Sequence, residues 1–313
     1  MEEFKVSVII PVYNAEKYVE KAVLSALELP ETGEIILIED CSPDNSLVIS
    51  LDLAAKHSRV KLLQHADKGN HGAGASRNLG LENATYPYIA FLDADDYYLF
   101  NRFRRSKQIF MDDPSIDGVY EPVGTKYYDS NAKEKFISQK GLDQHSAYQI
   151  TKISGHVAPG DLFNEFVKDN AEQWHTNAIT FEKELLKKTG MFSTSLKLHQ
   201  DTLMWFKMAY YGKIVAGETL KPVAMVGVHK RNRILTDSKT LSHFASLMYK
   251  EMFFWIVKEN VERDIFRIIF KRYLMTYRDS LQPKDHKYTR RFKYFINFLR
   301  IISNNPQVLL RLL

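Results

Sequence analysis

The sequence predicts an α/β protein in which helices cover both faces of a mostly parallel sheet and a helical extension follows. Short β-branched runs alternate with helix-like segments over about the first 100 residues, as in parallel strands joined by crossover helices. The chain has 313 residues, of which 45% are hydrophobic and 26% charged, a composition that suits a large globular core. From Leu241 onward, apolar residues recur at helical spacing.

Four strand-like runs come first, namely Lys5–Val12, Glu34–Asp40, Val60–Leu63 and Tyr88–Leu92. We expect helices between them, the first of them capped by Asn14. The carboxyl ends of parallel strands lie at one edge of a sheet, where ligands bind. The turns after these four runs should therefore converge on one crevice.

The pattern beyond Gly118 is less regular. Residues 119–128 and 223–228 are strand-like, and residues 201–211 are helix-like. The polar stretch 133–154 reads as a loop-rich excursion. This part of the chain therefore predicts little about the site by pattern alone.

Charge and cysteine content point to a cytoplasmic protein. Cys41 is the single cysteine, so no intrachain disulfide can form, and the acidic amino terminus does not resemble a signal peptide. The net charge of +5 arises in the tail, where about fourteen Lys and Arg face about six Asp and Glu after residue 240. No zinc-finger, RRM or KH signature accompanies these basic residues, so we expect no nucleic-acid partner.

The acid cluster Asp93, Asp95 and Asp96 directly follows the fourth apolar run. Clustered carboxylates on a tight turn suit a hard cation such as Mg²⁺ or Mn²⁺, which completes its shell with phosphate oxygens. In the glycine-rich segment 68–74 and the helix after it, Lys68 and Arg77 could meet phosphate or ribose. Taken alone, each signal has a plainer interpretation: Asp-x-Asp is often a solvated turn, and a glycine-rich segment is often only a loop.

Taken together, these motifs resemble the family 2 glycosyltransferases, which have the GT-A fold. The resemblance rests on four segments, Val6–Asn14, Ile38–Ser42, Gly74–Gly80 and Phe91–Asp96, and resumes at Asn177–Phe192 and His199–Thr202. It implies a three-layer α/β/α sandwich. It also implies a nucleotide-sugar-binding half over residues 1–125, an acceptor-binding half with the catalytic base over 126–235, and a helical extension over 236–313.

The resemblance assigns a role to each side chain of the crevice. Nucleotide contacts fall to Pro11, Tyr13 and Asp40, with Asp40 on the base, and Arg77 and Asp93 would contact ribose or donor sugar. Asp95 would hold the metal that bridges the diphosphate, and Asp201 would be the catalytic base. Most relatives have glutamate before that aspartate, whereas this chain has Gln200.

The implied activity is that of an inverting, metal-dependent, hexosyltransferase-type enzyme. It would move a sugar from a nucleotide-diphosphate donor, UDP-linked, to a hydroxyl of a glycan or lipid-linked glycan. Asp201 would take the proton of the attacking hydroxyl. The plainer interpretation of Asp201 is a helix N-cap, since a helical segment follows it.

Several further residues have an open role at this stage. His229 could ligate the metal or touch phosphate, and Arg231 and Arg233 could neutralise the phosphate charge. Alternatively, the whole segment could be a solvated basic loop. Trp174 and His175 could form a platform for an acceptor sugar or belong to the core.

The basic amphipathic tail has three interpretations. It could pack on the sheet domain, which we favour, form a homodimer contact, or lie peripherally on the anionic inner face of the membrane. Among rival functions, a haloacid-dehalogenase-type phosphohydrolase is disfavoured because the acids end the fourth strand and not the first. A sugar-phosphate nucleotidyltransferase lacks its usual basic loop after strand one. A catalytically weak nucleotide-sugar-binding or assembly subunit also stays open.

Overall fold

The computed structural model describes residues 3–140, 151, 153, 155, 157–229, 238–259, 261–281 and 287–312. The strands are β1 (Val6–Val12), β2 (Thr32–Glu39), β3 (Val60–Gln64), β4 (Tyr88–Phe91), β5 (Tyr97–Tyr98), β6 (Gly118–Tyr120), β7 (Val123–Tyr127), β8 (Ile179–Glu182), β9 (Ile214–Ala216) and β10 (Ala224–Val228). The α-helices are α1 (Val19–Leu27), α2 (Ser46–Lys56), α3 (Gly72–Asn83), α4 (Arg104–Asp112), α5 (Ser130–Lys140), α6 (Leu162–Val167), α7 (Leu186–Thr189), α8 (Gln200–Tyr211), α9 (Ser238–Ile256), α10 (Arg263–Ser280), α11 (Lys287–Asn304) and α12 (Gln307–Leu312). Short 3₁₀ helices are η1 (Pro159–Asp161), η2 (Thr176–Ala178) and η3 (Lys183–Leu185).

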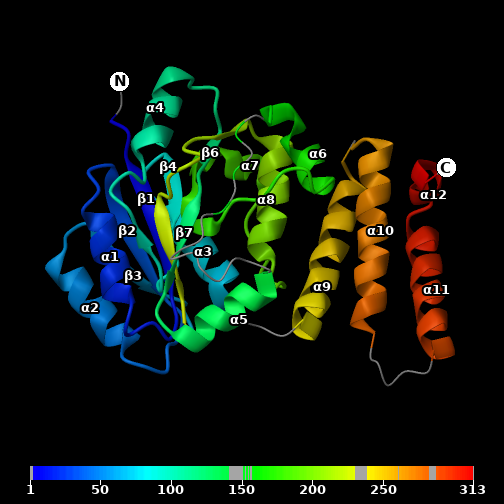
Figure 1. Cartoon of the computed structure of the whole chain (residues 1–313), viewed down its shortest axis with the longest axis horizontal. Coiled ribbons are helices and arrows are strands. Elements are labelled where there is room, and N and C mark those ends of the chain that lie inside the picture. The colour runs from blue at the N-terminus through cyan, green and yellow to red at the C-terminus, as the bar shows by residue number, and fades with distance from the viewer. Residues whose placement is uncertain are drawn as a thin grey trace.

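A seven-stranded sheet in the order β3-β2-β1-β4-β8-β6-β9 forms the centre of the protein (Figure 1). Its first four strands are mutually parallel, β8 runs antiparallel to both of its neighbours, and β6 and β9 are again parallel. A second sheet of three strands, in the order β5-β10-β7, lies beside it. The predicted α/β class with a mostly parallel central sheet is confirmed.

The side chains of the parallel strands divide between two apolar cores. Ile9, Ile36 and Ile38 belong to a core that also contains residues of α3 and α8, whereas Val8 and Ile10 join the core that includes α1. Alternate residues of a strand point to opposite faces, so a continuous β-branched run fills both cores. This burial fixes the strand register, and the register sets which residues end at the binding edge.

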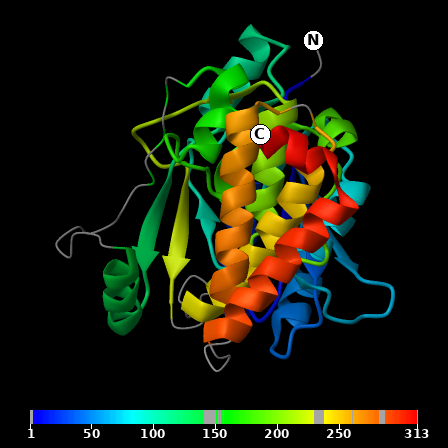
Figure 2. The same ribbon diagram turned by 90° about the vertical axis from the view of Figure 1, so that its right-hand side faces the viewer.

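The carboxy-terminal helices form a layer on one side of the sheet domain (Figures 1 and 2). Phe253 of α9 and Phe266 of α10 are fully buried in the same core as Ile9 and Phe206. The predicted helical extension is therefore present, and its inner helices share the core of the sheet domain. Within the described residues, none of the helices has the length and apolar character needed to cross a membrane.

A polar network joins the strands at the amino-terminal edge of the sheet. The Glu34 carboxylate on β2 accepts hydrogen bonds from Ser7 on β1 and from the backbone and side chain of Thr85, and it pairs with Lys61 on β3 at 2.7 Å. Burial raises the pKa of Glu34, but these partners outweigh burial and leave the pKa lowered. The buried carboxylate thus stays ionised and links three strands.

Four local expectations are wrong. Asn14 does not cap the first helix: its φ is 54°, and α1 begins after Tyr18. Helix α3 begins at Gly72, so it includes the end of the glycine-rich segment. Residues 130–140 form helix α5 where a loop was expected, while 141–150, 152 and 154 lie outside the described residues. The strand-like run 119–128 divides into β6 and β7, which belong to different sheets.

Candidate functional site

A cavity of about 520 Å³ opens at the carboxyl edge of the parallel strands. Its walls come from the turns after β1, β2 and β4, from the first turns of α3 and α8, and from β10. The lining residues are Pro11, Val12, Tyr13, Asn14, Ala15, Tyr18, Asp40, Ala73, Arg77, Asp93, Ala94, Asp95, Asp96, His175, Leu198, His199, Gln200, Asp201, Val226 and His229. The structure thus brings most of the sequence-predicted site residues into one place.

Asp40 connects β2 to the first turn of α3. Its carboxylate oxygens accept hydrogen bonds from the backbone N–H groups of His71 and Gly72, both at 2.8 Å. An anion at a helix amino terminus is favoured by the unpaired amides and the helix dipole. Asp40 therefore holds the glycine-rich segment against the cavity, and each of its oxygens has a further lone pair for a ligand N–H.

Arg77 and Asp93 form a partly buried ion pair on the cavity wall, with Nη2 2.7 Å from Oδ1. The guanidinium carbon of Arg77 lies 6.0 Å from the ring centroid of Phe91 and 5.7 Å from that of Phe192, and the side chain is almost fully buried. Among the described residues, its Nε and Nη1 atoms have no hydrogen-bond partner. Such donors are costly to leave unpaired, so a ligand oxygen at this wall would be stabilising.

Asp95 and His229 meet across 134 positions of sequence, with Nε2 3.0 Å from Oδ2. The imidazole of His229 is stacked on Tyr18 at a centroid distance of 4.8 Å, which restricts its orientation. Two neighbouring ligands of octahedral Mg²⁺, each about 2.1 Å from the ion, lie roughly 3.0 Å apart. The carboxylate oxygen and the imidazole nitrogen thus fit a divalent cation both in kind and in spacing.

Asp96 has a different environment from the other two acids. Its Oδ1 accepts from the N–H of Gly227 at 2.7 Å, and its Oδ2 accepts from Nδ2 of Asn177. Burial, with repulsion from Asp95 and Asp93, raises the pKa of Asp96 well above its usual range, although both hydrogen bonds act against this rise. Asp96 therefore links the turn that carries Asp93, Asp95 and Asp96, called the acid turn below, to Gly227 of β10. His229 follows Gly227 by two residues.

Asn177 holds the acid turn from the opposite side. Its Oδ1 accepts from the N–H of Asp93 at 2.9 Å while its Nδ2 donates to Asp96. Its own backbone carbonyl accepts from Nε of the fully buried Arg102 at 2.9 Å. Because β8 is antiparallel, the residues just before it lie at the same edge as the carboxyl ends of β1 and β4.

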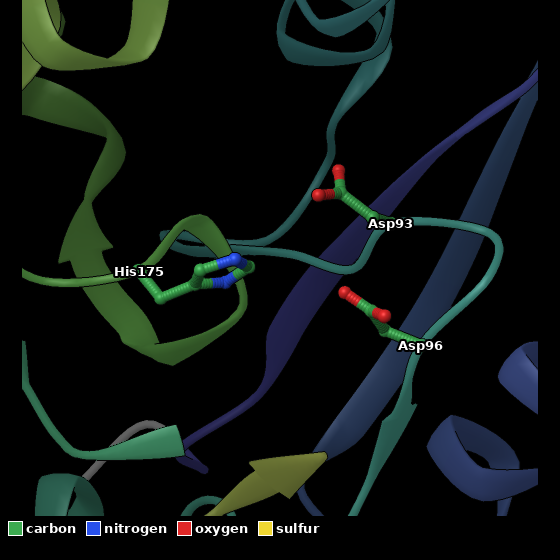
Figure 3. Close-up of side chains that lie close together, drawn as sticks. All are labelled: Asp93, Asp96 and His175. Carbon is green, nitrogen blue, oxygen red and sulfur yellow. The ribbon is translucent and has the colours of Figure 1, made fainter. Parts of the chain in front are cut away.

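A second group of candidate metal ligands is Asp93, Asp96 and His175, whose ligand atoms lie within 4.8 Å of one another. In Figure 3 the ring of His175 points toward the turn that carries the two acids. Both oxygens of Asp96 already accept protein hydrogen bonds. Nδ1 of His175 accepts from the backbone N–H of Asn177 at 3.2 Å, so the neutral ring carries its proton on Nε2 and offers no lone pair there. This group is therefore a poorer cation site than Asp95 with His229.

Asp201 stands on the first turn of α8 and lines the cavity. It is not the N-cap, because α8 begins at Gln200 after His199, which has a φ of 63°. The expectation of an N-cap is therefore wrong, although Oδ1 of Asp201 accepts from the N–H of Thr202 at 2.8 Å. The neighbouring Gln200 is 5% exposed, and its Oε1 has no partner among the described residues.

The remaining predicted residues lie as follows. Tyr13 lines the cavity and is 47% exposed, whereas the exposed Lys68 is not among the lining residues. Trp174 is 3% exposed and stacks on Tyr120 in the core, so it cannot offer its face to an acceptor sugar. Arg231 and Arg233 lie outside the described residues.

With this geometry in view, residues 7–161 match the protein-family model named Glycosyl transferase family 2. This stretch, just under half of the chain, is similar to the family 2 glycosyltransferases. EpsJ of Bacillus subtilis, described as an uncharacterized glycosyltransferase, is 38% identical over 63% of this chain and 54% of its own length. The minor teichoic acid biosynthesis protein GgaB of the same organism is 34% identical over 44% of this chain and 16% of its own length. The chain thus matches about half of EpsJ and a smaller share of GgaB.

Among solved structures, the fold is similar to that of Staphylococcus aureus TarS 1–349 in complex with UDP-GlcNAc. The TM-score is 0.62 at 19% sequence identity, and the match covers 88% of this chain and 80% of the TarS chain. At this identity the likeness establishes the GT-A-type fold alone. The fold that the sequence motifs implied is thereby confirmed.

Proposed function

We propose that the chain is an inverting, divalent-metal-dependent glycosyltransferase of the hexosyltransferase type. It transfers a sugar from a nucleotide diphosphate, UDP-linked, to a hydroxyl of a glycan or lipid-linked glycan. Residues 1–125 bind the nucleotide sugar, 126–235 contribute the acceptor side and the base, and 236–313 form the helical extension. The observation that carries this proposal is the common cavity of Asp40, Asp95 and Asp201 in a chain similar to the family 2 glycosyltransferases.

The nucleotide half of the cavity supports a UDP donor. Pro11 and Tyr13 line the cavity together with Asp40, whose oxygens retain lone pairs for the N–H of a nucleobase. Arg77 and Asp93 form the adjoining wall, where ribose or donor sugar would lie. The UDP-GlcNAc complex of TarS, which has the same fold, agrees with this donor class.

Asp95 and His229 are the residues that would hold Mg²⁺ or Mn²⁺. A bound divalent ion neutralises the charge that develops on the leaving diphosphate. The protein's own contribution is to fix both ligands, Asp95 through the acid turn and His229 through its stacking on Tyr18. Preorganised ligands need no rearrangement when the donor binds.

Asp201 acts as the base for a single displacement at the anomeric carbon. The acceptor oxygen attacks from the face opposite the diphosphate, a new C–O bond forms, and the bond to the diphosphate oxygen breaks. Asp201 takes the hydroxyl proton, and nucleoside diphosphate leaves. One displacement inverts the anomeric configuration. Aspartate is intrinsically a weak base, so its position beside the cavity supplies much of the effect.

The acceptor and its location rest on similarity alone. GgaB is named for teichoic acid biosynthesis, which agrees with a surface glycan as acceptor. A lipid-linked acceptor would place the protein in the cytoplasm at the inner face of the membrane. Peripheral membrane contact and a homodimer contact through the outer helices stay predictions.

The deciding experiment presents the purified protein with a panel of nucleotide sugars that includes UDP-GlcNAc, with Mn²⁺ or Mg²⁺. We expect release of UDP that depends on one donor and stops with chelator. Asp201→Asn should lower turnover by roughly 10²-fold or more, with UDP affinity unchanged. Nuclear magnetic resonance of the first-formed product should show the inverted anomer. If no nucleotide sugar binds at millimolar concentration, the proposal is wrong.

A further inference from the structure

His175 lies at the reaction side of the cavity, although it follows no parallel strand. It immediately precedes η2, the short helix that leads into the antiparallel strand β8, and its ring lines the cavity with Asp93 and Asp201. Both carboxylates are near enough to His175 to influence its titration. The ring thus faces the space between the proposed donor-sugar wall and the proposed base.

The hydrogen bond at Nδ1 determines what the ring can offer a ligand. Because the backbone N–H of Asn177 donates to Nδ1 at 3.2 Å, the neutral ring must carry its proton on Nε2. Burial lowers the pKa of His175, against the opposing influence of Asp93 and Asp201, and so favours this neutral ring. Within the described part of the chain, no side chain or carbonyl accepts a hydrogen bond from the Nε2–H group. The structure therefore presents a fixed, neutral donor to the cavity.

The chemistry of the surrounding groups selects the kind of ligand atom. A ring nitrogen of His175 and a carboxylate oxygen of Asp93 lie within 4.8 Å of each other, so an oxygen atom placed between the two side chains can form a hydrogen bond to each. A phosphate oxygen at this point would be repelled by Asp93 and Asp201. A hydroxyl is suited to it, because the oxygen can accept from the imidazole while its proton is donated to the carboxylate.

We propose that His175 contacts the sugar substrate, its Nε2–H group donating to the oxygen of a sugar hydroxyl that in turn donates to Asp93. This inference rests on the proposed glycosyltransferase function. The hydroxyl belongs either to the donor sugar or to the attacking acceptor, and the two sources give different results in the experiment below.

The decisive variant is His175→Asn. The side-chain oxygen of asparagine takes the place of Nδ1, so the hydrogen bond from Asn177 can be kept, but nothing reaches the position of Nε2. His175→Gln does the opposite, since its amide nitrogen reaches the position of Nε2. His243→Asn on the exposed face of α9 is the matched control. Each protein is assayed for binding of UDP and of UDP-GlcNAc or whichever panel donor turns over, for slow hydrolysis of that donor, and for melting temperature.

We expect His175→Asn to keep UDP affinity within about twofold and its melting temperature, but to lose roughly tenfold or more in kcat/KM for donor hydrolysis. His175→Gln should recover part of this loss. Weaker binding of the nucleotide sugar would assign the hydroxyl to the donor, whereas unchanged binding with lost turnover would assign it to the attacking oxygen, whose place water takes in the hydrolysis assay.

Wild-type kcat/KM in His175→Asn would overturn the inference, because the imidazole would then serve only to accept from Asn177. The same conclusion follows if His175→Asn and His243→Asn lose activity equally. If the wild-type protein neither binds nor hydrolyses any nucleotide sugar, the proposed function itself fails. That result is distinct because it does not depend on any variant.

Discussion

Replacing Asn177 by aspartate changes one atom in the clamp on the acid turn, and its effect can be worked out from the structure. In the native protein Nδ2 of Asn177 donates to the buried carboxylate of Asp96 while Oδ1 accepts from Asp93. Asn177→Asp keeps the shape and the second hydrogen bond but turns the donor into an acceptor. Two carboxylates then face each other where Asp96 is only 3% exposed.

The cost has two parts. Losing a hydrogen bond to a charged acceptor costs about 1.5–3 kcal/mol. Like charges about 4 Å apart repel by about 4 kcal/mol at an effective dielectric constant near 20. Uptake of one proton by the carboxylate pair limits the repulsion. We therefore expect the free energy of unfolding to fall by about 3–5 kcal/mol at pH 7, a large share of the total stability of a typical protein.

Urea unfolding between pH 5 and 8 tests this expectation, with Asn131→Asp on the exposed first turn of α5 as the matched control. The carboxylate of Asp96 and the one introduced at position 177 together bind a proton more tightly in the folded than in the unfolded state. The loss in free energy of unfolding caused by Asn177→Asp should therefore become smaller as the pH falls. The control should stay within about 0.5 kcal/mol of the wild-type protein. Full stability of Asn177→Asp at pH 7, or a deficit that does not change with pH, would refute the reasoning.

Two further substitutions test the sheet. Because the pKa of Glu34 is lowered in the folded protein, its contribution is present above the unfolded pKa of about 4.5 and is lost as the pH falls through the lower folded value. Glu34→Gln should thus lower the free energy of unfolding at pH 7, and its urea midpoint should change less with pH than that of the control Glu82→Gln on the exposed face of α3. Parallel plots of urea midpoint against pH for the two variants would contradict this. Gly80→Ala would place a Cβ atom 2.4 Å from Cγ2 of Ile9, so we expect a loss of about 1–3 kcal/mol despite the better helix propensity of alanine. Gly160→Ala, with no atom near its added Cβ, should be neutral in thermal unfolding, and equal melting temperatures for the two variants would exclude the steric account.

The part of the site that the sequence predicted is the part carried by parallel strand ends. Asp40 and the acids at Asp93–Asp96 each follow an apolar run, and the common direction of the strands brings them to one edge. That geometry follows from local pattern and a general rule of sheet topology. The role of Asp201 as base, and the choice of Asp95 within the acid cluster as the metal ligand, needed the family resemblance, because local sequence does not distinguish either of them from a neighbouring or solvated acid.

Asn177, which sequence reasoning missed, and His175, to which it gave only an open role, reach the edge by routes that local pattern does not encode. Asn177 and His175 arrive because β8 enters the sheet in the antiparallel direction, so that the start of a strand lies where strand ends were expected. The resumed family match at Asn177 was the available signal for the first of them. The pairing of His229 with Asp95 depends on a second sheet whose register is set by strands far apart in the chain.

The expected cap at Asn14 failed for a related reason. Asn14 lines the cavity, and its backbone N–H donates to Ser42 at 3.2 Å on the turn after β2. The contact between these two turns thus outweighs the local preference of asparagine for a helix N-cap, and α1 begins at Val19 instead.

The shared core of the sheet domain and its carboxy-terminal helices has a consequence for how the molecule comes apart. Phe253 and Phe266 occupy one apolar cluster with Phe206, whose helix also carries Asp201 on its opening turn. The residues on the two sides of position 235 therefore share one apolar core. Calorimetry should register one melting event for both parts, and a ligand that steadies the cavity should protect amide hydrogens of α9 from exchange with solvent.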